Sequence, residues 1–198
     1  MAQSLNRKVI ATIGFAVAVL AGGCSGALFK VKPAASLPPL PSSAKSADAG
    51  GVAVRVAPLL TDEESQQLFE ANLPLSGVLP VRIELSYETG GVPLELKRTR
   101  FRLRDGEGRE WKILAAKQAI SRILKANGVT LYNPNSRKQF EKEFTAYAID
   151  LKTPLPASER RRQGFLFFQT PRKEPVTSPH GLVLAVDGLP QAAEIRLN

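Results

Sequence analysis

The chain has 198 residues and a formal net charge of +9, with 27 lysines and arginines against 18 aspartates and glutamates. Hydrophobic residues at 43% and charged residues at 23% are typical of a globular protein, so the chain can build a hydrophobic core. With one cysteine, Cys24, the fold must be held without an internal disulfide. One histidine, His180, and one cysteine cannot make a zinc site of the usual type or a histidine-based triad with a mature cysteine.

Residues 7–24 have the organisation of an export signal. Arg7 and Lys8 precede an apolar run at 9–21, which ends in two glycines and Cys24. A membrane-spanning helix needs roughly 20 apolar residues, so this run is too short for a comfortable span. We therefore expect residues 1–23 to be a removable signal peptide, with an unprocessed N-terminal anchor as the alternative.

The segment 20–24, Leu-Ala-Gly-Gly-Cys, resembles the lipobox of bacterial lipoprotein precursors, with Ala21 where leucine is commonest. The resemblance covers only the first 24 residues. It implies that the Cys24 thiol is lipid-modified, that the signal is cut before it, and that the new N-terminus is acylated. In that family an aspartate after the cysteine commonly signals retention in the inner membrane. Ser25 therefore implies anchoring to the outer membrane, facing the periplasm or the cell surface, with the inner membrane as the alternative.

Residues 24–51 are dominated by Ala, Ser, Pro and Gly and carry no periodic apolar pattern. Such a composition predicts a tether, followed by one folded domain at 52–198. Removing Arg7 and Lys8 with the signal leaves 25 cations against 18 anions, or +7. This surplus favours anionic glycans or lipid headgroups as partners. Nucleic acid is not an expected partner, because an exported protein does not meet the genome.

Apolar periodicity predicts a mainly β domain. Apolar alternation and turn signals indicate strands at 52–60, 80–87, 93–105, 110–114, 181–186 and 193–197. The run 164–169 is apolar on both faces and too short for a helix, so we expect a strand that is buried on both faces. A capping box from Thr61 to Glu64 predicts a short helix to about residue 70, and helical spacing predicts helices at 115–127 and 136–149. Seven or eight strands with a two-helix insertion at about 115–150 favour an immunoglobulin-like β-sandwich, with a small β-barrel as the alternative.

Four arginines alternate along the predicted strand 93–105. They are Arg98, Arg100, Arg102 and Arg104. Alternate strand residues lie roughly 6.5 to 7 Å apart on one face, so the row would extend about 20 Å and suit phosphate or carboxylate groups on a glycan or lipid surface. The competing interpretation is a solvated face balanced by cross-strand glutamates such as Glu110, which contribute little stability.

No arrangement in the sequence favours catalysis, a metal or a cofactor, and His180 between Pro179 and Gly181 is more typical of a surface turn than of a general base. The sequence predicts a lipid-anchored envelope protein that acts as a non-catalytic binding or assembly module. Its expected partners are the membrane, through acylated Cys24, and an anionic ligand or an envelope protein. Two alternatives stay open: a subunit of a secretion or surface-appendage complex, and a lipid-anchored glycan hydrolase that uses two carboxylates.

Overall fold

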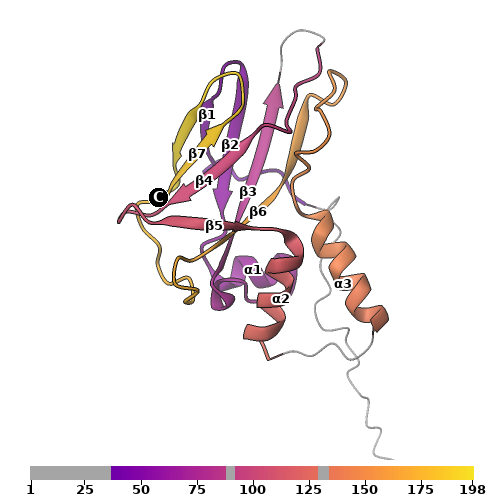
Figure 1. Cartoon of the computed structure of the whole chain (residues 1–198), viewed down its shortest axis with the longest axis vertical. Coiled ribbons are helices and arrows are strands. Elements are labelled where there is room, and N and C mark those ends of the chain that lie inside the picture. Colours follow the sequence, from indigo (N-terminus) through magenta and orange to yellow (C-terminus); the bar gives the residue numbers. More distant parts are fainter. Residues whose placement is uncertain (1–36, 88–91, 129–133) are drawn as a thin grey trace, which may run out of the picture.

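The computed structural model describes residues 37–87, 92–128 and 134–198 (Figure 1). The strands are β1 (Lys45–Asp48), β2 (Val52–Pro58), β3 (Val78–Tyr87), β4 (Arg100–Arg104), β5 (Glu110–Leu114), β6 (Arg161–Gln169), β7 (Val183–Asp187) and β8 (Ala193–Arg196). The helices are α1 (Asp62–Phe69), α2 (Ala116–Ala126) and α3 (Pro134–Ala146), with a 3-10 turn at Pro74–Ser76. Figure 1 shows the three helices gathered at one end of the sheet. The described part of the chain is therefore mainly β.

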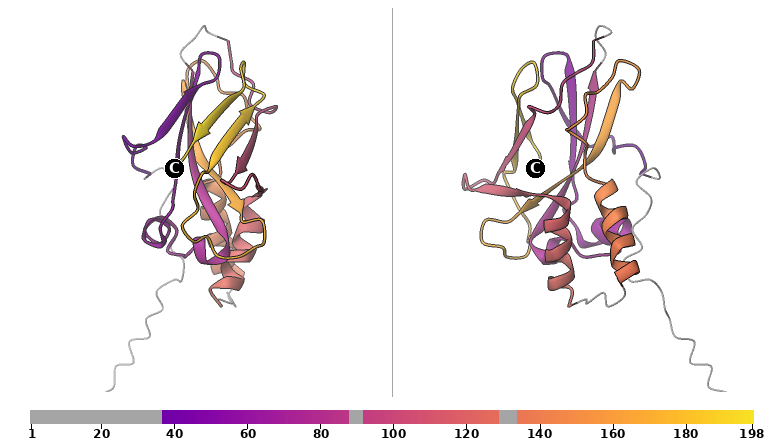
Figure 2. Two further views of the ribbon diagram at one scale, coloured as in Figure 1. Left: turned by 90° about the vertical axis from the view of Figure 1, so that its left-hand side faces the viewer. Right: turned by 45° about the vertical axis from the view of Figure 1, so that its right-hand side comes forward.

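The eight strands form one antiparallel sheet in the order β1-β2-β3-β6-β5-β4-β7-β8. The sheet curls until the turn after β1 meets the turn between β7 and β8, where the amide of Gln191 donates to the carbonyl of Ala49 at 3.1 Å (Figure 2). The result is nearly a barrel. This pairing fits the small-barrel alternative and does not confirm the immunoglobulin-like sandwich. Alternation and strand count are the same in both architectures, whereas the pairing of β6 with both β3 and β5 joins all eight strands into one sheet.

β6 separates two apolar clusters. Leu166 and Phe168 point into the cluster inside the sheet, and Phe165 and Phe167 point into a second cluster formed with the helices. The inner cluster includes Val54, Ile83, Leu103, Trp111 and Val186. The prediction that 164–169 is buried on both faces is confirmed.

The helical cluster depends on the amphipathic faces of the three helices. The capping box of α1 is confirmed, because the amide of Glu64 donates to Thr61 Oγ1 and the amide of Thr61 donates to Glu64 Oε2, each at 3.2 Å. α2 and α3 lie between β5 and β6 in the sequence, as predicted. They bury Ile120, Ile123 and Phe144 in one apolar cluster with Phe165 and Phe167 of β6.

The folded part begins before residue 52. β1 lies within the segment 24–51 that the composition assigns to a tether, and it pairs with β2 along its whole length. Upstream of β1, Leu40 is only 6% exposed, and Arg82 and Arg55 donate to the carbonyls of Pro38 and Pro41. The polar sequence of β1 carries no apolar period, so only its pairing with β2 reveals it as a strand.

The predicted strand 93–105 is a strand only at β4, and the residues before it are irregular except for a bridge between Leu94 and Leu155. Arg82 and Glu84, on the face of β3 opposite its inner apolar residues, are buried rather than exposed. The chain at 37–41 contributes to this burial. No helix within the described ranges is long and apolar enough to cross a membrane.

Candidate functional site

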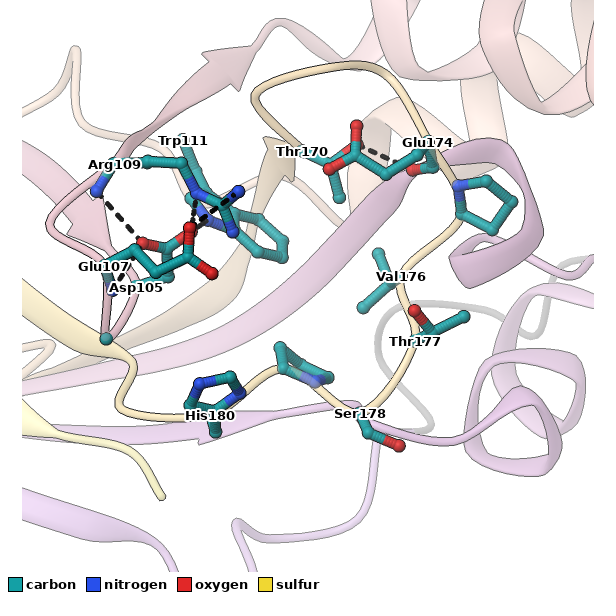
Figure 3. Close-up of a pocket in the computed structure, with 13 residues that line it drawn as sticks. Asp105, Glu107, Arg109, Trp111, Thr170, Glu174, Val176, Thr177, Ser178 and His180 are labelled. Carbon is teal, nitrogen blue, oxygen red and sulfur yellow. Dashed lines mark hydrogen bonds and ion pairs between the residues drawn. The ribbon is translucent and has the colours of Figure 1, made fainter.

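A small pocket of about 130 Å³ lies between the β4–β5 turn and the loop that follows β6 (Figure 3). His180 and the carboxylates of Asp105, Glu107 and Glu174 line the same pocket, which makes it the candidate site for catalytic chemistry in the described part of the chain. Its polar lining residues are Asp105, Glu107, Arg109, Thr170, Glu174, Thr177, Ser178 and His180.

Asp105 organises the turn from β4 to β5. Its carboxylate accepts hydrogen bonds from the amides of Glu107 (3.1 Å) and Arg109 (3.0 Å), from Arg109 Nε (2.9 Å) and from Trp111 Nε1 (3.1 Å). Burial alone would raise the pKa of Asp105, but the hydrogen bonds from Trp111 and Arg109 outweigh it and hold the pKa below its usual value. A carboxylate with four donors and a lowered pKa is a poor general base, so its role is structural.

The other charged groups of the pocket do not complete a catalytic pair. Glu107 forms an ion pair with Arg109 at 3.1 Å and is largely exposed. Glu174 Oε2 is buried and accepts no hydrogen bond within the described part of the chain. Figure 3 shows His180 apart from the cluster of Asp105, Arg109 and Trp111. The pocket thus offers one carboxylate free of donors, whereas glycoside hydrolysis needs two in set positions.

The arginine row is only partly continuous. Arg100, Arg102 and Arg104 alternate on the exposed face of β4, as predicted, whereas Arg98 lies in the turn before the strand. Arg102 pairs with Asp187 of β7 at 2.7 Å. Arg100 Nη1 donates to the carbonyls of Lys97 and Thr99, both at 2.9 Å. Two of the guanidiniums therefore have partners within the domain, which favours the solvated-face interpretation for this part of the row.

A second hollow, a groove of about 500 Å³, lies where β5, α2 and the end of β6 meet. We call it the basic groove; its lining residues are Lys112, Leu114, Lys117, Gln118, Ser121, Arg122, Gln169 and Lys173. Four of the eight are cations and none is an aspartate or glutamate. In the described ranges, Lys112, Lys117 and Lys173 form no ion pair. An anion is the ligand that such a lining attracts.

Separate elements hold these cations in place. Lys112 lies on β5 directly opposite Gln169 of β6, and Lys117 lies in the first turn of α2. Arg122, further along α2, donates from Nε and Nη2 to the carbonyl of Ser76 (3.3 and 3.2 Å) and from Nη2 to the carbonyl of Lys173 (3.3 Å). The arginine therefore connects the helix to two loops, including the loop that carries Lys173.

Sequence reasoning missed the basic groove, because its cations come from segments about sixty residues apart at the extremes and share no motif. No protein family, curated protein or solved structure matches the chain in the comparisons made. Among residues 37–87, 92–128 and 134–198, no three His, Cys, Asp or Glu side chains are grouped to hold a metal ion. Cys24, the predicted lipidation site, lies outside the described residues.

Proposed function

We propose that the protein is a lipid-anchored lipoprotein of the bacterial cell envelope whose domain binds an anionic partner without catalysing a reaction. The observation that carries the binding part is the basic groove, where four cations surround one hollow that no carboxylate lines. The lipobox-like segment 20–24 supports the anchor, and Ser25 supports an outer-membrane location with the inner membrane as the alternative.

The length of chain between the anchor and the domain supports a position close to the bilayer. Residues 25–36 separate Cys24 from Leu37, the first described residue, and a fully extended chain of that length spans at most about 45 Å. Leu37 packs against the helical cluster. An anchor at Cys24 would therefore hold the helical end of the domain, and with it the basic groove, within reach of the membrane surface.

The alternative functions have less support. A hydrolase that uses two carboxylates would need a second free carboxylate beside Glu174, but Asp105 is already bound by four donors. A subunit that assembles by strand addition would need an open sheet edge. The edge strands β1 and β8 have four residues each, and the turns beside them are in contact.

Replacing Cys24 with alanine is expected to abolish stable membrane retention, because the thiol that would carry the lipid is lost. The measurement is the share of protein in the membrane fraction after a high-salt wash, which removes proteins held only by exposed charges. Ser25→Ala is the matched control and is expected to leave retention unchanged. A Cys24→Ala protein that stays with the washed membranes as the wild type does would refute the lipid anchor.

A further inference from the structure

We propose that the basic groove binds a phosphate group, either on a lipid headgroup or on a soluble phosphate ester. The inference deepens the proposed function by naming the ligand chemistry of the same site. Only the headgroup source depends on the membrane anchor. Binding of phosphate by the groove can be tested on a chain that carries no lipid.

The charge of the groove favours a multiply charged anion. Lysines on protein surfaces usually stand apart or beside carboxylates, since like charges repel. Here Lys112, Lys117 and Lys173 line one hollow with Arg122, and the neighbouring acids Glu110 and Glu174 are not part of its lining. Their mutual repulsion is relieved when an anion enters, so the field of the groove favours phosphate over a singly charged carboxylate.

The donor geometry is partly fixed before a ligand arrives. The three hydrogen bonds that Arg122 donates to the carbonyls of Ser76 and Lys173 hold its guanidinium in one orientation. No described atom accepts from its Nη1, which leaves that nitrogen free to donate to a ligand. A preorganised guanidinium loses little freedom on binding a phosphate oxygen. The exposed lysines add positive charge around the Arg122 guanidinium.

The remaining lining fits the rest of a phosphate ester. Gln118 and Ser121 lie on the first half of α2, whose N-terminal end favours negative charge. Leu114, a buried residue of the helical cluster, contributes the one apolar side chain of the lining. A volume of about 500 Å³ is within the range of ordinary ligand sites and exceeds the needs of a single inorganic ion. The groove therefore suits a phosphate with its substituent.

The test compares charge reversal in the groove with the same charge change elsewhere. The chain from residue 24 onward, carrying Cys24→Ala in every sample, is mixed with phosphatidylcholine vesicles that contain or lack phosphatidic acid, whose headgroup is a phosphate monoester. We expect binding only to the anionic vesicles, and Lys117→Glu with Lys173→Glu to weaken it by about tenfold or more. The control Lys138→Glu with Lys142→Glu changes two exposed lysines of α3 that do not line the groove, and should have a much smaller effect.

A titration with sn-glycerol 3-phosphate, followed by NMR of the amides of β5 and α2, separates the two sources. Displacement from the vesicles by this compound at millimolar or lower concentration would identify a soluble ester as the ligand, and binding to vesicles alone would identify a headgroup. The proposal is overturned if neither probe binds, if the groove variant binds as the wild type does, or if the control loses as much. It is also overturned if only Arg100→Glu with Arg102→Glu loses binding. Because the protein in every sample lacks Cys24 and carries no covalent lipid, these results are independent of the Cys24 retention test.

Discussion

The Phe144→Ala variant is expected to have a free energy of unfolding about 3 to 5 kcal/mol lower than the wild type. The ring of Phe144 is fully buried and joins α3 to the sheet. It stacks on Phe167 of β6 with ring centroids 4.8 Å apart, and lies 5.3 Å from Phe69 of α1. Removing it leaves a cavity between the two helices and the strand. Equilibrium unfolding in urea measures the loss.

The matched control for this prediction is Thr145→Ala, one residue further along α3. Thr145 is exposed, so its replacement should change the free energy of unfolding by no more than about 0.5 kcal/mol. If Phe144→Ala lowers the free energy of unfolding by no more than the control does, α3 does not pack on β6 as it does in the structure.

Replacing Asp105 with alanine is expected to lower the free energy of unfolding by about 2 to 3 kcal/mol, because the buried indole N–H of Trp111 and two turn amides lose their acceptor. The loss should also open the turn that positions Arg109. Glu107→Ala is the control, since Glu107 is 59% exposed and its ion pair contributes little. Equal effects of the two substitutions would contradict the structural role of Asp105.

The stability contributed by Asp105 should depend on pH. The folded protein holds the pKa of this carboxyl below its unfolded value, so the unfolded chain binds the proton first as the pH falls. The contribution is complete above the unfolded pKa, at about pH 4 and higher, and is lost as the pH falls through the folded pKa. The stability difference between the wild type and Asp105→Asn should therefore narrow below about pH 4. A difference that stays constant from pH 7 to pH 2 would contradict this.

Local patterns predicted most of the elements, because each is set by residues close together in sequence. The capping box of α1 needs only Thr61 and Glu64, and the burial of β6 on both faces follows from the apolar run 164–169. The shape of the sheet could not be predicted in the same way. It depends on the pairing of β5 with β6, which are separated in the sequence by α2 and α3. The residues of either strand do not by themselves determine which strand lies beside it. β1 is polar and is defined by its partner β2.

The same limit applies to the candidate sites: features set by neighbouring residues could be predicted, and features that join distant segments could not. Alternation correctly placed Arg100, Arg102 and Arg104 on one face, but the partner of Arg102 is Asp187 of β7, which lies 85 residues later in the chain. No local pattern in the sequence indicates the basic groove. Lys112, Lys117 and Lys173 look like ordinary surface lysines in the sequence, and they surround one hollow only because the fold brings β5, α2 and the loop after β6 together.

The proposed lipid anchor is tested most directly by the intact mass of the protein extracted from its native membrane. We expect the mass of a chain that begins at Cys24, increased by a diacylglyceryl group and a fatty acid. Such a mass would place the domain on a bilayer and make the search for phosphate-bearing partners one among envelope components. The mass of the uncut chain would contradict lipidation at Cys24 and make residues 9–21 a retained anchor instead.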